Sequence, residues 1–416
     1  MTDRGAQRDF APAITLAFGF LAGVLEGFDI FSMGLAAPKV APAMHLSAQQ
    51  LGLVLSGVPL GMFFGALLGG RLGDALGRKT TLVIAVLVIG AFQLATAFAP
   101  GYSALIGVRV CCGLGIGAAM PNVIALASEA AGETGSIFNV ALVMAGIPSG
   151  GIVATAIAIA GAEHGDWHTN FYIGGLAPLV LAPIMAFALP ESREFLKVRT
   201  TGPTVQAAAG ILAALFSRGR AFITLWLWIS LFTTFVIIYV LVNWMPVLMG
   251  LKGFSKAEAV VLGLPISLGG VVGPILIGRL MERRRSPGVL LWCYAGLIAG
   301  LIYLAEVGHD FAMLFAAITV AATLVQAGAF VLMGLAPQYY PTERRGVGIG
   351  AAVAAARIGA ICGPAITGFL LGAGLGPSQV ILSLVPVALA AALGVGLLLI
   401  TGKSALQAQP QPEDPA

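Results

Sequence analysis

Apolar runs long enough to cross a membrane recur along the whole chain, and they limit its fold more than any other feature. A helix needs roughly 20 predominantly apolar residues to cross a hydrocarbon core. The chain is 58% hydrophobic and only 10% charged over 416 residues, which leaves too little polar surface for a soluble globule. A transmembrane barrel would instead show alternating segments of roughly 10 residues. The sequence therefore predicts an all-α membrane protein, and its 56 glycines suit closely packed helices.

The apolar runs form two sets of six, separated by one long polar segment. We predict an N-terminal six-helix bundle at 1–189, a cytoplasmic linker at 190–220 and a C-terminal six-helix bundle at 221–402. The Pro- and Gln-rich tail, 403–416, is expected to be disordered. The expected spans are 12–37, 50–70, 80–98, 102–121, 136–160, 171–189, 221–248, 258–280, 288–306, 311–335, 346–371 and 378–400.

Basic residues are distributed unevenly between the two sides of these spans. Seventeen of the 22 Lys and Arg residues fall in loops or tails on the side of the N-terminus, three fall on the other side, and two lie inside spans. Cytoplasmic loops carry the excess of Lys and Arg, so we expect both termini in the cytoplasm of a bacterium and the protein in its inner membrane. Topology also explains a pI near 9.0 without any nucleic-acid partner.

A polar loop occurs twice, half a chain apart. Gly70–Lys79 follows the second span, and the similar stretch Gly278–Arg285 follows the eighth. Parallel repeats of six helices around a central cavity are an architecture of secondary transporters. The repeat therefore predicts two pseudo-symmetric six-helix bundles.

Several motifs resemble those of a known family. Gly70–Lys79 resembles the G-x-L-x-D-x-x-G-R-K loop of the major facilitator superfamily. Further marks of that superfamily follow in order: Arg109-x-x-x-Gly113-x-x-x-Gly117, Gly146–Gly151 and Pro190-Glu191-Ser192.

A narrower resemblance is to the aromatic acid:proton symporters, and within them to 3-(3-hydroxyphenyl)propionate carriers. Their D-G-x-D motif is similar to Glu26-Gly27-Phe28-Asp29, in which Glu replaces the first Asp. The resemblance implies a twelve-helix alternating-access fold that imports a small aromatic carboxylate with a proton. We further expect a functional monomer that needs no cofactor and no metal.

Four ionisable residues lie well inside predicted spans: Glu26, Asp29, Arg109 and Arg357. Charges at such depth persist mainly where they face a cavity or each other. Glu26 and Asp29 share one helix face, and two such close carboxylates should hold one proton between them near neutral pH, which describes a proton-coupling site.

Either arginine could bind the substrate carboxylate. Arg109 can reach Asp29 if helices 1 and 4 are neighbours, and protonation would then release its guanidinium to the substrate. The alternative is a fixed ion pair with no role in transport. Arg357 is the other candidate, or else a packing charge between the halves.

An aromatic ligand also needs flat apolar walls and a few polar contacts. The candidates are Phe28, Phe31, Asn122, Tyr239, Asn243 and Trp244. The aromatic residues could equally belong to the core or to an interfacial belt, and Asn122 could equally link two helices. Asp74, Arg78 and Glu129 are candidates for gating, with a solvated loop position as the alternative for Glu129.

Two other classes of function remain open. A drug or metabolite:proton antiporter would share the fold, and Gly146–Gly151 resembles a motif of such exchangers. A membrane receptor would want a sizeable output domain, which the short tail does not supply. No nucleotide-binding loop, His/Cys cluster or serine-nucleophile motif suggests an enzyme.

Overall fold

The structure of the chain is a computed structural model that describes residues 3–130, 136–161, 166–192, 194–196, 215–216, 220–284, 288–340 and 345–407. Helices and the segments that connect them make up the described residues. The helices are α1 (Asp3–Ala43), α2 (Ala48–Leu76), α3 (Arg78–Ala97), α4 (Tyr102–Ala130), α5 (Ser136–Met144), α6 (Gly146–Ala160), α7 (His168–Ala188), α10 (Ala221–Leu251), α11 (Lys256–Val261), α12 (Leu264–Arg284), α13 (Val289–Glu306), α14 (Phe311–Leu335), the short 3₁₀ turn η1 (Ala336–Tyr339), α15 (Arg345–Gly372) and α16 (Pro377–Gln407).

Within the described residues, twelve helical stretches are long and apolar enough to cross a membrane, so the predicted all-α membrane fold is confirmed. The predicted fifth and eighth spans are each interrupted. The fifth divides into α5 and α6 at Ala145, close to Pro148, which has no N–H to give to the preceding turn. The eighth divides into α11 and α12.

Two predicted boundaries differ from the observed ones. Helix α4 continues to Ala130, past the predicted end at residue 121. The polar Asn122 stays inside the helix because its side chain donates to the carbonyls of Gly69 and Ala118. Helix α16 continues to Gln407, into the tail that we expected to be disordered, while 408–416 lie outside the described residues.

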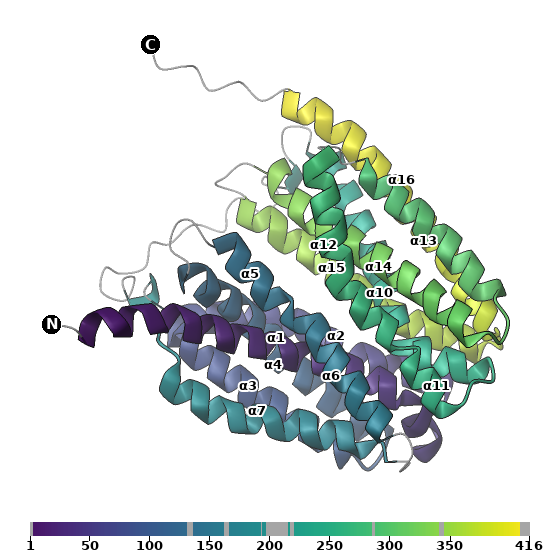
Figure 1. Cartoon of the computed structure of the whole chain (residues 1–416), viewed down its shortest axis with the longest axis horizontal. Coiled ribbons are helices and arrows are strands. Elements are labelled where there is room, and N and C mark those ends of the chain that lie inside the picture. The colour runs from purple at the N-terminus through teal and green to yellow at the C-terminus, as the bar shows by residue number, and fades with distance from the viewer. Residues whose placement is uncertain are drawn as a thin grey trace.

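The helices pack as two groups that touch along one boundary. Helices α1–α7 form one half of the molecule and α10–α16 the other, and Figure 1 shows the two halves diverging toward the side from which both termini emerge. Across the boundary α1 contacts α10, α2 contacts α15, and α6 contacts α11 and α12. We call the side of the termini the terminal face and the opposite side the closed end. Most of the predicted linker, including 197–214, lies outside the described residues.

Close approaches of backbone to backbone fix the position of α1. A Cβ atom added to Gly27 would lie 1.7 Å from the carbonyl oxygen of Ile147, so α1 and α6 can touch only because position 27 is glycine. Helices α2 and α4 meet in the same way, where Gly61 faces Gly113. The motif glycine Gly113 therefore positions α4, which carries Arg109.

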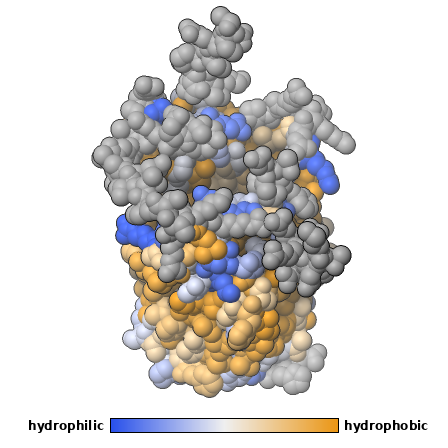
Figure 2. Space-filling model, turned by 90° about the vertical axis from the view of Figure 1, so that its left-hand side faces the viewer, coloured by the Kyte–Doolittle hydropathy of each residue, from blue (hydrophilic) through white to orange (hydrophobic). Residues whose placement is uncertain are grey.

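The surface of the molecule separates by polarity. Figure 2 views the terminal face, on which hydrophilic residues gather, while the flank below it is predominantly hydrophobic. A hydrophobic flank is what a helix bundle presents to lipid. The chain is therefore a multi-pass membrane protein.

Candidate functional site

An ion pair between Asp29 and Arg109 lies in the middle of the N-terminal half. Arg109 Nη1 donates to Asp29 Oδ1 at 2.8 Å, and Nη2 donates to Asp29 Oδ2 at 3.2 Å. Both residues are only 1% exposed. Helices α1 and α4 are in contact, as the proposed meeting of these side chains required.

Gln93 of α3 forms a hydrogen bond to the arginine of this ion pair. Gln93 was not among the candidates that the sequence predicted. Its Oε1 accepts a hydrogen bond of 2.7 Å from Arg109 Nη1, and Gln93 itself is fully buried. Gln93 is a neutral amide, so the presence of charge inside an apolar span does not select it. A polar side chain inside the otherwise apolar span 80–98 was the signal that could have found it.

The guanidinium of Arg109 is almost fully occupied. Nη2 also donates to the backbone oxygen of Asp29 at 3.3 Å, and Cys112 Sγ lies 3.5 Å from Asp29 Oδ1. The ring of Phe171 lies 5.9 Å from the guanidinium carbon. Of the three guanidinium nitrogens of Arg109, only Nε has no acceptor among the described residues, so a substrate carboxylate has no ready access to this arginine.

Glu26 and Arg357 face each other across the boundary between the halves. Glu26 Oε1 of α1 lies 3.9 Å from Arg357 Nη2 of α15, with side chains 5% and 18% exposed. Arg357 Nη1 also points at Met62 Sδ, 3.5 Å away. Tyr239 of α10 lies close enough to both charges to interact with them electrostatically. The two acids on one helix face thus have separate arginine partners, one inside a half and one between the halves.

The other candidates for substrate contact are placed differently. The aromatic ring of Phe28 packs at Gly174 beside Gln93, and that of Phe31 packs at Gly151 on the boundary. Asn122 of α4 donates to Gly69 O of α2 at 3.0 Å and so links the two helices. Asn243 donates to Tyr239 O at 2.9 Å, and the fully buried Trp244 donates to Pro364 O at 3.0 Å.

Comparisons with known proteins identify the family of the chain. The sequence matches the Major Facilitator Superfamily over residues 19–288 and 266–415. It is 37% identical over 386 residues to the 3-(3-hydroxy-phenyl)propionate transporter of Escherichia coli (strain K12). The aligned region covers 93% of this chain and 94% of that protein. The chain belongs to the major facilitator superfamily.

Further similarities lie within the same superfamily. The 4-hydroxybenzoate transporter PcaK of Pseudomonas aeruginosa is 35% identical, over 92% of this chain and 91% of that protein. A crystal structure of a D-xylose-proton symporter superposes with a TM-score of 0.75 at 19% identity, over 93% of this chain and 97% of that chain, which shows a shared fold. The resemblance to aromatic acid transporters that the motifs predicted is thus confirmed.

The superfamily loop between α2 and α3 lies at the terminal face and joins α4. Arg78 forms an ion pair with Glu129 at the end of α4, and Ser192 Oγ donates to the same carboxylate at 2.9 Å. Asp74, the third gating candidate, is exposed, and no described residue forms an ion pair with it. Arg78 and Glu129 therefore connect the loop to the segment that follows α7.

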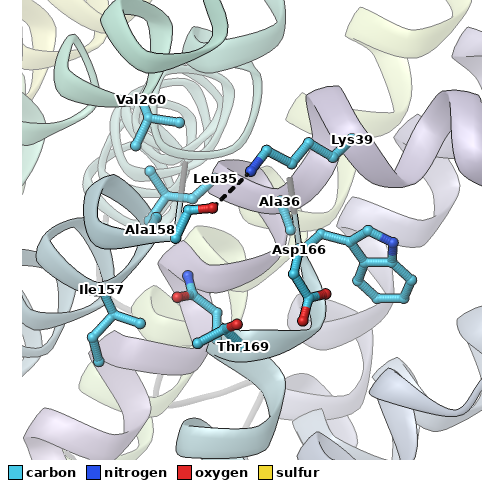
Figure 3. Close-up of a pocket in the computed structure, with 11 residues that line it drawn as sticks. Leu35, Ala36, Lys39, Ile157, Ala158, Asp166, Thr169 and Val260 are labelled. Atoms are coloured by element: carbon cyan, nitrogen blue, oxygen red, sulfur yellow. Dashed lines mark hydrogen bonds between the residues drawn. The ribbon is translucent and has the colours of Figure 1, made fainter. Parts of the chain in front are cut away.

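A small pocket lies at the closed end of the molecule, beside the C-terminal part of α1. The two ion pairs lie nearer to the middle of α1, at Glu26 and Asp29. Leu35, Ala36 and Lys39 of α1 line one wall, and Val260 of the other half lines another (Figure 3). Lys39 Nζ donates to Gly161 O at 3.3 Å. Asp166 stands nearby, and the N–H of His168 that donates to it holds the pKa of its carboxyl below the usual value. None of the predicted site residues lines this pocket.

No group of three or more His, Cys, Asp or Glu side chains that could hold a metal ion occurs in the described part of the chain.

Proposed function

We propose that this protein imports a small aromatic carboxylate together with a proton by alternating access. One observation carries the proposal: two arginines lie between or beside membrane helices, each facing its own carboxylate. Charged groups inside membrane helices mark pathways for ions, protons and substrates. The printed names of the relatives, transporters of 3-(3-hydroxyphenyl)propionate and 4-hydroxybenzoate, support an aromatic acid as the cargo.

The two ion pairs take different roles in this proposal. Asp29 and Arg109, held by Gln93, form the proton site, since the buried pair can change its state only when Asp29 gains or loses a proton. Arg357 binds the substrate carboxylate, because its guanidinium is partly exposed and only loosely engaged. Tyr239 is placed to contact the same ligand.

The termini lie in the cytoplasm of a bacterium in this proposal, as the distribution of Lys and Arg predicts. The halves diverge toward the terminal face (Figure 1), and in this proposal that arrangement corresponds to an inward-facing state of a transporter in the inner membrane. The two halves rock about the boundary where α1 meets α10 and α2 meets α15. We further propose that one chain forms one complete transport unit.

The test is uptake into proteoliposomes that contain the purified protein. Labelled 3-(3-hydroxyphenyl)propionate and 4-hydroxybenzoate should accumulate inside when the lumen is alkaline, and a protonophore should abolish the accumulation. If neither acid accumulates while a lipophilic cation leaves in exchange for protons, the protein is an antiporter and the proposal is wrong.

A further inference from the structure

We propose that Glu26 occupies Arg357 in the place of the substrate carboxylate, and that the substrate displaces Glu26 and so makes it take up a proton. The inference rests on the proposed function and adds a mechanism by which the substrate and a proton bind together.

The contact between Glu26 and Arg357 is loose compared with the other ion pair. Its closest approach is 3.9 Å, whereas Arg109 holds Asp29 with two hydrogen bonds of 2.8 and 3.2 Å. Strong carboxylate–guanidinium hydrogen bonds measure about 2.7–2.9 Å. A free carboxylate that reached Arg357 with that geometry would bind it better than Glu26 does.

Arg357 has donors to spare for such a ligand. A guanidinium offers five N–H donors. Nη1 points at the sulfur of Met62, which is a weak acceptor, and Nη2 is the atom nearest to Glu26. A substrate carboxylate can therefore bind in the bidentate manner once Glu26 has moved aside.

The surroundings of Glu26 decide what happens after the displacement. The charged and titratable groups that face it are Arg357 from α15, Tyr239 from α10 and Asp29 from its own helix. Asp29 is already paired with Arg109 of α4. The part of α6 that packs on α1, Gly146–Gly151, carries no ionisable side chain.

Glu26 is therefore left without a positive partner when the substrate takes Arg357. It is only 3% exposed, and a buried carboxylate without a counter-charge binds a proton. The proton comes from water and adds to a carboxylate oxygen of Glu26, which becomes the neutral acid. The substrate stays an anion and Arg357 a cation, so Glu26 takes up one proton per anion, in addition to the proton that the proposed function assigns to Asp29.

The length of the side chain at position 26 supports this role. The D-G-x-D motif that Glu26-Gly27-Phe28-Asp29 resembles has Asp at the position of Glu26. A side chain shorter by one methylene would end about 1.5 Å farther back, the length of one C–C bond. Since the contact already measures 3.9 Å, Asp at this position would not reach Arg357 from the same backbone. The extra methylene lets residue 26 act as the competitor.

Calorimetric titration of the purified protein tests this inference, with 3-(3-hydroxyphenyl)propionate as the probe. Titrations in buffers of different ionisation enthalpy count the protons taken up with the ligand. The native protein should take up roughly one proton more per ligand than Glu26→Gln at pH 8, and its affinity should fall by up to about tenfold per pH unit. Glu26→Gln should bind more tightly than the native protein at pH 8, with an affinity that varies with pH by less than about twofold per unit.

Two further variants complete the experiment. Glu26→Asp keeps an acid but does not reach Arg357, so this acid should already be protonated before the ligand arrives. The variant should therefore take up fewer protons with the probe than the native protein and bind it more tightly at pH 8. Glu306→Gln, at an exposed position on α13, is the matched control and should behave like the native protein.

Several outcomes would overturn the inference. If Glu26→Gln takes up as many protons as the native protein, or Glu26→Asp binds the probe more weakly, then Glu26 does not compete with the substrate, although the proposed function stands. If the native protein binds neither this acid nor 4-hydroxybenzoate, the proposed function fails as well.

Discussion

Arg109 Nη1 lies 2.8 Å from Asp29 Oδ1 inside the N-terminal half, with both residues 1% exposed. Breaking a buried ion pair by removing one partner costs about 3–5 kcal/mol, because the remaining charge is left uncompensated. Movement of Arg109 toward a ligand therefore requires Asp29 to be neutralised first. Arg357 faces no such barrier, since its contact with Glu26 is longer and partly exposed. The two arginines should thus respond differently to mutation.

Replacing Arg357 by Lys should weaken substrate binding. Lysine keeps the positive charge but loses the bidentate geometry of the guanidinium. A hydrogen bond to a charged group contributes about 1.5–3 kcal/mol, so the dissociation constant should rise about tenfold or more. Direct binding of 3-(3-hydroxyphenyl)propionate to the purified variant measures this. An unchanged affinity would show that the carboxylate binds elsewhere.

Replacing Asp29 by Asn should weaken the coupling of transport to the proton gradient. Asn has nearly the same shape as Asp but neither carries a charge nor gains a proton in this range. We expect accumulation driven by a pH gradient to fall well below the native level, while exchange of labelled for unlabelled substrate across the membrane continues. Glu306→Gln serves as the control for loss of an acid at an exposed position. Gradient-driven accumulation at the native level would contradict the assignment of Asp29.

Replacing Gln93 by Leu should move the pH profile of uptake toward acid. Gln93 Oε1 supports the charge of Arg109 whether or not Asp29 is ionised. Without this hydrogen bond Arg109 depends more strongly on Asp29, so neutralising Asp29 requires more acid. A charge-assisted hydrogen bond of about 1.5–3 kcal/mol corresponds to about 1–2 pH units. Uptake measured between pH 5 and pH 8 would reveal this shift of the pH profile. A profile that coincides with that of the native protein would show that Gln93 does not contribute to the proton site.

Most of the fold was predictable from the sequence. The length and spacing of the apolar runs set the number of spans, because the hydrocarbon core requires about 20 apolar residues per helix. The ends of the helices were less predictable, since Asn122 satisfies its polarity by bonding to another helix and thus lets α4 continue. The interruption at Ala145 depends on how the turn before Pro148 packs, which the apolar pattern does not show.

The sequence predicted which charged residues belong to the candidate site but not how they pair. Charge inside apolar runs selected Glu26, Asp29, Arg109 and Arg357, because lipid excludes unpaired charges. Their pairing could not be read from the spacing, since Glu26 and Asp29 lie on one face of α1 yet turn to α15 and α4. Gln93 was not predicted because it carries no charge. Trp244 was predicted to contact the ligand, but in the structure it is buried and donates a hydrogen bond to Pro364 O, which the sequence does not show.

Replacing Gly27 by Ala should prevent the normal packing of α1 on α6. The added Cβ would lie 1.7 Å from the carbonyl oxygen of Ile147, and a backbone atom cannot move aside as a flexible side chain can. We expect a lower yield of folded protein and a lower melting temperature in detergent. Gly107→Ala on α4, where the Cβ would meet no atom within 4 Å, is the control and should melt like the native protein. Equal melting temperatures for the two variants would contradict the proposed close packing.

Replacing Glu129 by Gln should slow transport without changing the preference among substrates. Glu129 pairs with Arg78 and accepts from Ser192 at the terminal face, away from the arginine sites. Removal of its charge weakens this link between α3, α4 and the segment after α7. Rates of uptake for two aromatic acids should therefore fall by the same factor. A change in the ratio of the two rates would place Glu129 in substrate selection instead.

The direction of proton movement during substrate entry is the most direct test of the proposed symport. Proteoliposomes with an entrapped pH indicator, at equal pH on both sides, would receive 4-hydroxybenzoate from outside. Neutral aromatic acid also crosses lipid unaided, so vesicles without protein and vesicles with Asp29→Asn supply the background. Symport predicts that the lumen acidifies faster with the native protein than in either background. A lumen that turns alkaline, or acidifies no faster than the background, would contradict proton-coupled import.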